Sequence, residues 1–299
     1  MRIAFFGLGN MGNPMAANLI SSSQHEVGVF DLDTAKGENL IAAGGQWIDD
    51  VPAALAQADI IMTSLPGPKQ VGVFAFSPEG VFAHAKTGAC WLELSTNNMA
   101  TCQKILAAAN DKGISYLDAP VSGGDEGARA ATLTILVGGE KVVFEQYLPV
   151  LALLGKTITH LGPSGAGYAA KIAQVILCYL HTVALSEALM LGVKAGVDTS
   201  AMLNIIQNST GRSYVADRYG PPILNGDYDP SFALGLALKD MRLAMELADT
   251  LNIKLPMSEL VTDIYQQACE HYGTEANHLS AVRLLEESSA TPLRATTHL

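Results

Sequence analysis

A glycine-rich hexapeptide near the start of the chain has the residue types and spacing of a dinucleotide-binding loop. Gly7-Leu8-Gly9-Asn10-Met11-Gly12 follows an apolar, strand-like segment and opens a helical pattern. In such a loop the first glycine permits a tight turn, the second lets the backbone approach a pyrophosphate, and the third lets helix pack on strand. The N-terminus of the following helix attracts anions through its N–H groups and its dipole. The hexapeptide therefore predicts a site for the phosphates of NAD.

An aspartate at the end of the second predicted strand, Asp31, points to the choice of cofactor. It lies 19 residues after Gly12, where a carboxylate can bind both hydroxyls of the adenosine ribose and repel a 2′-phosphate. The residues that follow, Leu32-Asp33-Thr34, include no Arg to neutralise such a phosphate. The sequence thus favours NAD over NADP. In the alternative interpretation Asp31 and Asp33 only flank a turn, with Asp33 capping the next helix.

Two more segments follow predicted strands and are expected near the nicotinamide half of the cofactor. Leu65 and Pro66 come after the fourth strand, and Thr96 comes after the fifth. Ligands of open parallel sheets bind beyond the carboxyl ends of the strands. The alternative for Thr96 is a purely structural role, as the N-cap of the next helix.

The first half of the chain alternates short apolar runs with helical patterns, which predicts a mostly parallel, doubly wound sheet of the Rossmann type. Strands are predicted at Arg2–Phe6, Glu26–Phe30, Gln46–Ile48, Asp59–Ser64, Cys90–Leu94, Ile114–Asp118, Leu133–Val137 and Thr157–Leu161. Helices are predicted between them, for example at Asn10–Ser22, Thr34–Ala43 and Asn97–Asp111.

The second half contains only helical patterns. A long helix is predicted from Ala166 to Lys194, with further helices at Thr199–Asn208, Ser231–Leu251, Pro256–Tyr272 and Ser280–Glu287. The glycines and proline at 162–167 predict a boundary between an NAD-binding domain, residues 1–162, and an all-helical substrate and oligomerisation domain, residues 163–299. The polar stretch 288–299 is predicted to be a mobile tail.

Composition narrows the class of protein. The chain of 299 residues is 49% hydrophobic and 16% charged, which suffices for two soluble domains without disulfides. Its net charge of −11 disfavours nucleic acids and anionic membranes as partners. Four cysteines without CxxC spacing, and scattered histidines, predict reduced thiols and no metal site. No signal peptide is expected before the first strand, and the apolar stretch 172–191, broken by polar residues, reads as a buried helix. We therefore expect a cytoplasmic protein.

Four ordered motifs together resemble the β-hydroxyacid dehydrogenase family, which includes 3-hydroxyisobutyrate dehydrogenase. They are the glycine loop continuing into Met15-Ala16-Ala17-Asn18-Leu19, then Asp118-Ala119-Pro120-Val121-Ser122-Gly123-Gly124, then Gly165-Ala166-Gly167-Tyr168-Ala169-Ala170-Lys171, and finally Lys239-Asp240. The resemblance spans nearly the whole chain. It implies a Rossmann-type domain joined by a long helix to an all-α domain, and a homodimer or homotetramer.

The resemblance also implies roles for individual residues. Lys171 matches the catalytic lysine, and Ser122, Gly123 and Gly124 match the loop that grips the substrate carboxylate. Leu65, Pro66 and Thr96 match positions that contact the cofactor, and Lys239 matches a second lysine near the nicotinamide. The chemistry is sensible, since an ammonium can stabilise a developing alkoxide and relay its proton while N–H groups bind a carboxylate.

One position departs from the family pattern. The family places two asparagines three and four residues after the lysine, whereas this chain has Gln174 and Val175. Val175 cannot form a hydrogen bond, and Gln174 is the neighbouring amide that could reach the substrate. The usual anchor of the substrate hydroxyl is therefore in question.

These features favour an NAD-dependent dehydrogenase of a short 3-hydroxy acid, a small anionic substrate resembling 3-hydroxyisobutyrate, with Lys171 as proton relay. A first alternative is a reductase of small aldehyde acids such as glyoxylate, succinic semialdehyde or tartronate semialdehyde. An imine reductase and a catalytically silent NAD-binding protein are further alternatives. The retained Lys171 argues against the imine reductase, and Val175 alone motivates the silent protein.

Overall fold

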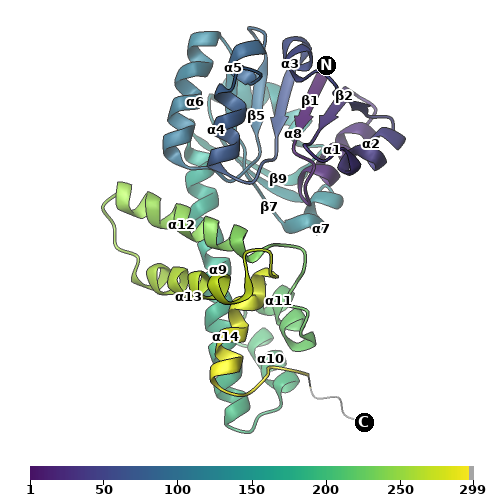
Figure 1. Ribbon diagram of the computed structural model, residues 1–299. Helices are drawn as coiled ribbons and strands as arrows, with labels where there is room; N and C mark the ends of the chain where they lie inside the picture. Colours follow the sequence, from purple (N-terminus) through teal and green to yellow (C-terminus); the bar gives the residue numbers. More distant parts are fainter. Residues whose placement is uncertain (296–299) are drawn as a thin grey trace. The chain divides into compact units, whose positions relative to one another are not determined.

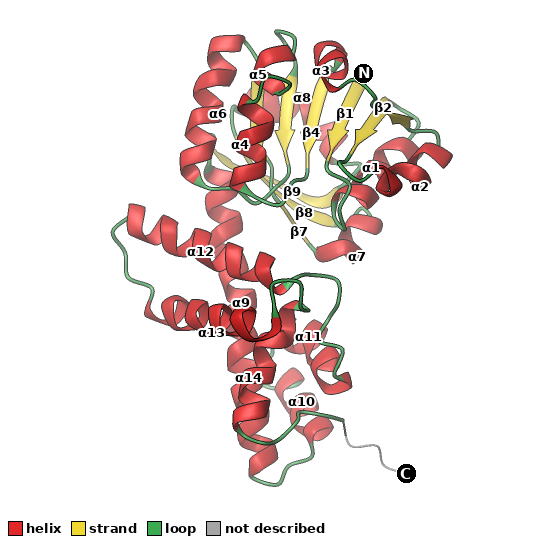
Figure 2. Cartoon of the chain, in the orientation of Figure 1, coloured by secondary structure: helices red, strands yellow, loops and turns green. Residues whose placement is uncertain are grey.

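The computed structural model describes residues 1–295 of the 299, and their contacts divide the chain into two compact units (Figure 1). The first unit is Met1–Lys171, and the second begins at Ile172. Strands belong to the first unit, while the described part of the second is built from helices apart from a single β-bridge (Figure 2). The division falls inside the long helix, and the domain boundary at residues 162 and 163 stays a prediction.

Within the described residues, nine strands form one sheet in the first unit. They are β1 (Arg2–Phe6), β2 (Glu26–Phe30), β3 (Gln46–Trp47), β4 (Ile60–Thr63), β5 (Cys90–Glu93), β6 (Ser115–Asp118), β7 (Val121–Ser122), β8 (Leu133–Gly138) and β9 (Gly155–Gly162). The order is β3-β2-β1-β4-β5-β6-β8-β7, and β9 also pairs with β8. Pairing is parallel from β3 to β6 and antiparallel where β8 meets β6 and β7. The predicted doubly wound, mostly parallel sheet is confirmed.

Helices cover both faces of this sheet. They are α1 (Gly12–Ser21), α2 (Glu38–Ala42), α3 (Val51–Gln57), α4 (Pro68–Phe76), α5 (Val81–His84), α6 (Met99–Lys112), α7 (Gly124–Arg129) and α8 (Lys141–Leu151). Successive residues of β1 alternate between the two cores: Phe5 packs with the α1 and α8 side, and Phe6 with the α4 and α6 side. Both faces are therefore buried, which explains the continuous apolar strands.

The register aligns the last residues of four neighbouring strands in one row. Phe6 of β1 pairs with Thr63 of β4, Thr63 with Glu93 of β5, and Glu93 with Asp118 of β6. Paired residues in adjacent strands project from the same face of a sheet. Three polar side chains thus lie side by side at the carboxyl edge, directly before the loops that were predicted to bind the cofactor.

The second unit consists of helices, as predicted. They are α9 (Ala166–Lys194), which begins in the first unit, and α10 (Thr199–Gln207), α11 (Tyr214–Asn225), α12 (Leu234–Thr250), α13 (Pro256–Tyr272) and α14 (Ala281–Ser288). Helix α11 was not predicted, because Pro221 and Pro222 lie inside it. Its start is fixed instead by Ser213, which accepts the Ala216 N–H at 3.0 Å, and its end by Gly226 in the left-handed conformation.

Helix α9 is the one described helix long and apolar enough to cross a membrane by length and composition. In the second unit its residues Val175 and Tyr179 pack in one apolar cluster, and Leu185 and Leu189 in another. These residues of α9 therefore belong to the core of the second unit.

The stretch after α14 corrects the prediction of a mobile tail as far as it is described. Leu293 is fully buried, and Arg294 forms an ion pair with Glu286 at 2.8 Å. An apolar side chain and a charged one fasten this segment to α14. The remaining predicted tail, 296–299, lies outside the described residues.

Candidate cofactor and reaction site

The glycine loop has a geometry that suits a dinucleotide. Gly7 has φ of +95°, and a Cβ there would overlap the Ser64 carbonyl oxygen. A Cβ at Gly12 would overlap the Gly7 carbonyl oxygen, so both positions require glycine. A Cβ at Gly9 would meet nothing within 4 Å, which leaves open space above the loop. The N-cap of α1, Met11, makes no side-chain hydrogen bond to the first helical turn. The loop therefore fits the phosphates of NAD or NADP.

Asp31 is tied to this loop. One of its carboxylate oxygens accepts the Leu8 N–H at 2.7 Å, and the other accepts the Asp33 N–H at 3.0 Å and pairs with Lys36 at 3.3 Å. Burial pushes the pKa of Asp31 upward, but the N–H groups of Asp33 and Leu8 and the Lys36 ammonium outweigh it and lower the pKa. Asp31 is therefore an ionised acceptor. The sequence interpretation missed Lys36, a cation beside Asp31.

Asp33 has the structural role that was considered for it. Its side chain accepts the Ala35 N–H at 3.2 Å and so caps the short helix Thr34–Gly37. Asp33 therefore has only the capping role of the alternative interpretation, whereas Asp31 lies within hydrogen-bond distance of the glycine loop itself.

The loops after β4 and β5 are bonded to each other. The Leu65 N–H donates to the Ser95 hydroxyl oxygen at 2.8 Å, and the Ser95 N–H donates to Glu93 at 2.9 Å. Pro66 is exposed and Thr96 is half-buried. Asn98, not Thr96, caps α6, because its side chain accepts the Thr101 N–H at 2.9 Å. The structural alternative for Thr96 is thereby removed.

The start of α9 is fastened to the carboxyl end of β6. Asp118, which is fully buried, accepts the Gly165 N–H at 2.7 Å and the Tyr168 N–H at 3.2 Å. A Cβ at Gly167 would overlap the Leu136 carbonyl oxygen, so the helix packs directly on strand backbone. Lys171 follows in the next turn and is 8% exposed. The first unit thus places a lysine one turn beyond a helix start anchored at the edge of the sheet.

The loop after β6 leads through β7 into two glycines with unusual backbone angles. Ser122 is half-buried, whereas Gly123 and Gly124 are exposed and have φ of +132° and +65°. Only glycine adopts such angles easily, and neither residue has a side chain to shield its N–H group. This loop can supply N–H donors to an anion, and it belongs to the same unit as Lys171.

Two predicted site residues, Gln174 and Lys239, belong to the second unit. Gln174 is exposed on α9, and Val175 beside it is buried in an apolar cluster. Lys239 on α12 pairs with the buried Asp240 at 2.9 Å, and Asp240 also accepts the Tyr179 hydroxyl at 3.0 Å. The roles of Gln174 and Lys239 stay predictions.

Sequence reasoning missed a group of buried polar residues at the carboxyl edge. Glu93 is fully buried and accepts a hydrogen bond from the Tyr168 hydroxyl, which itself contacts the Tyr116 hydroxyl at 2.7 Å. Trp91 donates to Thr63 at 2.8 Å beside them. The one available signal was an acidic residue inside the apolar run Cys90-Trp91-Leu92-Glu93-Leu94.

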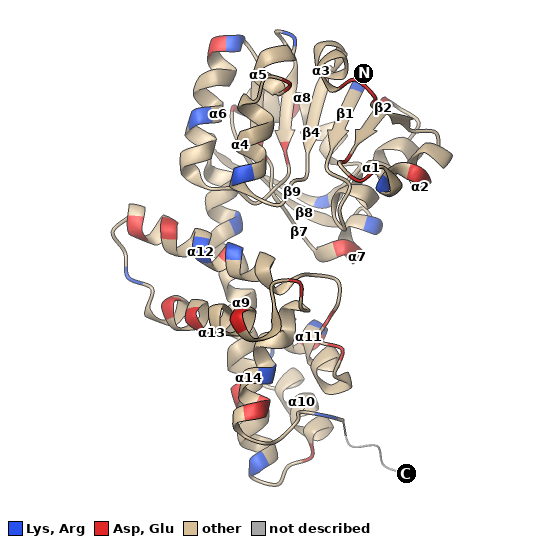
Figure 3. Ribbon diagram, in the orientation of Figure 1, with Lys and Arg blue, Asp and Glu red and all other residues tan. Residues whose placement is uncertain are grey.

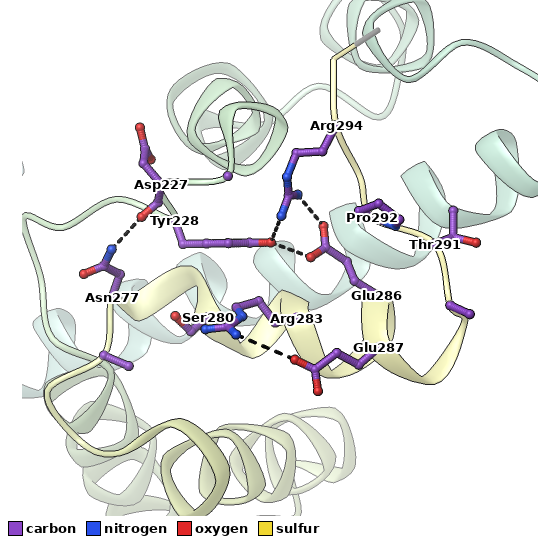
Figure 4. Close-up of a pocket in the computed structure, with 13 residues that line it drawn as sticks. Asp227, Tyr228, Asn277, Ser280, Arg283, Glu286, Glu287, Thr291, Pro292 and Arg294 are labelled. Carbon is purple, nitrogen blue, oxygen red and sulfur yellow. Dashed lines mark hydrogen bonds and ion pairs between the residues drawn. The ribbon is translucent and has the colours of Figure 1, made fainter.

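A separate cavity of about 690 Å³ lies in the second unit (Figure 4). Arg294 and Tyr228 meet Glu286 there, while Arg283 pairs with Glu287 at 3.7 Å. Both arginines are paired with glutamates, so the cavity is poorly suited to an anionic substrate.

The described part of the chain brings no three His, Cys, Asp or Glu side chains together in a way that could hold a metal ion. Lys and Arg are interspersed with Asp and Glu along both units, in keeping with the diffuse acidic charge expected from the sequence (Figure 3).

Comparisons with known proteins identify both halves of the chain. Residues 2–162 match the family model of the NAD-binding domain of 6-phosphogluconate dehydrogenase, and residues 165–285 match that described as NAD-binding of NADP-dependent 3-hydroxyisobutyrate dehydrogenase. The chain is 41% identical to 2-(hydroxymethyl)glutarate dehydrogenase of Eubacterium barkeri, with 89% of this chain and 88% of that protein covered. It is 35% identical to NAD-dependent L-serine dehydrogenase of Pseudomonas aeruginosa, with 89% and 91% covered.

A solved structure has a similar fold. That of Mycobacterium tuberculosis 3-hydroxyisobutyrate dehydrogenase with L-serine has a TM-score of 0.84 and 31% identity, over 95% of this chain and 98% of that one. Fold, glycine loop and matches together define an oxidoreductase that binds NAD or NADP. The chain belongs to the β-hydroxyacid dehydrogenase family, the family that its motifs resemble.

Proposed function

We propose that this protein oxidises the primary alcohol of a short 3-hydroxy acid with NAD, using Lys171 for proton transfer. The observation that carries the proposal is the anchored start of α9, where Asp118 binds two backbone N–H groups one turn before Lys171. A helix held at the sheet edge gives a long, flexible lysine a defined origin. Precise placement of a reacting group accounts for a large part of catalysis.

In this scheme oxidation breaks the C–H and O–H bonds of the carbinol and forms an aldehyde. NAD, when bound, supplies the hydride acceptor. Lys171 in its unprotonated form accepts the hydroxyl proton and passes it toward solvent, and the ammonium formed in this way stabilises the negative charge that develops on the substrate oxygen. The Ser122 hydroxyl and the N–H groups of Gly123 and Gly124 bind the substrate carboxylate, for which charge-assisted hydrogen bonds are strong.

The substrate class follows from the relatives. The names of those relatives contain serine, 3-hydroxyisobutyrate and 2-(hydroxymethyl)glutarate. Each of these compounds has a hydroxymethyl group and a carboxylate on one carbon. They differ only in the third substituent, which is an amine, a methyl or a carboxyethyl group. We propose this shared unit as the substrate of the present protein. Because Val175 is buried among apolar side chains, we propose Gln174 as the amide that reaches the substrate. We also propose for Lys239 the role of the lysine that it matches in the family, near the nicotinamide.

NAD is the proposed cofactor because Asp31 is ionised and lies within hydrogen-bond distance of the glycine loop. A carboxylate that binds both hydroxyls of the adenosine ribose favours a cofactor without a 2′-phosphate. The second candidate function is the reductase of small aldehyde acids. Lys36, beside Asp31, favours it, since its ammonium could pair with the 2′-phosphate of NADPH.

The proposed assembly is a cytoplasmic homodimer or homotetramer. On helix α9 Leu177 is 50% and Leu191 75% exposed, and the same face carries the exposed His181 and Ala184. Large exposed apolar side chains in one stripe favour burial against another copy. The cysteines Cys90 and Cys102 are buried and unpaired, as suits a reducing compartment.

The experiment is a panel of alcohols assayed for NADH and NADPH formation. It contains 3-hydroxyisobutyrate, L-serine, 3-hydroxypropionate and 2-(hydroxymethyl)glutarate, with 2-methyl-1-propanol as the matched alcohol that lacks a carboxylate. We expect turnover of at least one hydroxy acid with NAD and none of 2-methyl-1-propanol. Inactivity across the acids, with reduction of glyoxylate or succinic semialdehyde by NADPH, would replace the proposal by the second candidate.

A further inference from the structure

A buried carboxyl group, that of Glu93, lies beneath the loops of the candidate site without facing solvent. Glu93, Thr63 and Asp118 end three adjacent strands, are paired in register, and are each fully buried. Burying a carboxyl costs several kcal/mol unless hydrogen bonds replace the lost water. Burying a carboxyl group destabilises the fold more than burying an apolar residue of the same size, so the hydrogen bonds of Glu93 indicate its role.

Both oxygens of Glu93 are occupied. Oε1 accepts the Ser95 N–H at 2.9 Å and the Thr63 hydroxyl at 3.3 Å, and Oε2 accepts the Tyr168 hydroxyl. Because the Tyr168 hydroxyl uses its one hydrogen in the bond to Glu93, the Tyr116 hydroxyl, at 2.7 Å, donates a hydrogen bond to the Tyr168 oxygen. Burial raises the pKa of Glu93, while the hydrogen bonds from Ser95, Tyr168 and Thr63 oppose that rise. The geometry is a chain of donors that converges on one carboxyl.

Two arms leave this carboxyl and end at different parts of the site. One arm runs through Ser95, whose hydroxyl accepts the Leu65 N–H at 2.8 Å and so holds the loop after β4. The other runs through Tyr168, whose side chain is fixed by Glu93 and whose N–H is fixed by Asp118. Lys171 lies three residues after Tyr168, on the neighbouring position of the same helix face.

We propose that Glu93 is a positioning residue that holds the Leu65 loop for the cofactor and the Lys171 helix for proton transfer in one fixed relation. The inference rests on the proposed function in that Lys171 is its proton-transferring group. Glu93, Ser95 and Tyr168 touch no substrate in this scheme. A hydroxyl and a carboxyl serve better here than an apolar core, because hydrogen bonds fix direction as well as distance.

The test compares three variants that each remove one hydroxyl. Tyr168→Phe cuts the arm to Lys171, and Ser95→Ala cuts the arm to Leu65. Tyr147→Phe is the matched control, a tyrosine that is buried on α8 against the other face of the sheet. Each variant is assayed with NAD and the best hydroxy acid of the panel, and each apoprotein is titrated with NAD alone.

The two arms predict opposite signatures. We expect Tyr168→Phe to lower kcat about 10-fold with the NAD dissociation constant changed less than about 2-fold, because the lysine is misplaced. We expect Ser95→Ala to raise the NAD dissociation constant about 5-fold, the effect of one hydrogen bond, with a smaller change in kcat. Tyr147→Phe should change neither quantity by more than about 2-fold.

Two further readouts separate positioning from loss of folded protein. In Tyr168→Phe the deuterium isotope effect on kcat, measured with substrate labelled at the carbinol carbon, should rise, whereas unfolding of a fraction of the enzyme leaves it unchanged. Acylation of Lys171 in the apoprotein, followed by mass spectrometry, should change in rate in Tyr168→Phe and not in Tyr147→Phe.

Equal behaviour of Tyr168→Phe and Tyr147→Phe in all these measurements would overturn the inference. Failure of the proposed function is distinguishable, since wild-type protein would then oxidise no hydroxy acid, while NAD affinity and Lys171 acylation would still report on the two arms.

Discussion

The two ends of the carboxyl edge of the sheet are built from similar residue types in contrasting surroundings. Beside β2, Asp31 pairs with Lys36, and their side chains are 13% and 45% exposed. At β4 to β6, Thr63, Glu93 and Asp118 are fully buried. Solvent screens the Lys36 ammonium and makes this ion pair replaceable, whereas the buried groups cannot lose a partner without leaving an unsatisfied polar atom. We therefore expect the exposed end to adjust cofactor choice and the buried end to fix catalytic geometry.

The buried end should respond most strongly. Asp118→Asn replaces one of the two carboxylate oxygens that hold the start of α9 by an NH₂ group, which cannot accept an N–H. We expect kcat to fall roughly 10- to 100-fold, because Lys171 loses its fixed origin. The matched control is Asp33→Asn, at an exposed cap where Asn can accept the same N–H, so kcat should stay within about 2-fold. A similar kcat for the two variants would remove the contrast between the ends.

Asp118 also predicts a dependence of stability on pH. Burial raises its pKa from 3.8 to about 6, against the N–H groups of Gly165 and Tyr168 that lower it. Because folding raises this pKa, Asp118 gives stability below about pH 4 that is lost as the pH rises through about 6. We expect the free energy of unfolding of wild type to fall between pH 4 and 7 by on the order of 2 kcal/mol more than that of Asp118→Asn. Both tryptophans, Trp47 and Trp91, belong to the first unit, so their fluorescence in a urea titration measures it; parallel pH profiles would contradict the expectation.

At the exposed end the next largest effect is expected from Asp31→Asn. Loss of the charge should raise the NAD dissociation constant about 10-fold and narrow the preference for NAD over NADP. The value of kcat at saturating NAD should stay within about 2-fold, because this residue lies far along the edge from Lys171. Titrations of both cofactors provide the check. An unchanged ratio of the two affinities would show that Asp31 does not select the cofactor.

The smallest effect is expected from Lys36→Ala. An exposed ion pair contributes about 0–1 kcal/mol, so NAD affinity should change less than about 2-fold. If Lys36 can pair with a 2′-phosphate, its removal should weaken NADP binding about 5-fold. Equal effects on the affinities for NAD and NADP would mean that Lys36 only neutralises part of the charge of Asp31.

Much of the fold could be predicted from the sequence because periodicity reports burial. Strands such as Arg2–Phe6 and helices such as Ala166–Lys194 have bounds that the structure reproduces. β7 has only two residues and α11 contains Pro221 and Pro222, so neither gives a periodic signal. The segment up to residue 295 is packed through Leu293 and Arg294, and such long-range contacts cannot be read from a polar composition.

The site could be predicted only in part. The glycine loop could be recognised in the sequence because the spacing of its glycines follows from the local backbone geometry. Lys36 was missed, since only the turn after β2 brings it to Asp31. Glu93 and Tyr168 are 75 residues apart, and their contact depends on strand register and on the start of α9.

The most direct test of the account is NADH formation by Lys171→Ala, measured on the same sample as NAD binding. We predict that turnover of the best hydroxy acid falls at least about 1,000-fold while the NAD dissociation constant stays within about 3-fold. Turnover within about 10-fold of wild type at saturating substrate would contradict the assignment of proton transfer to Lys171.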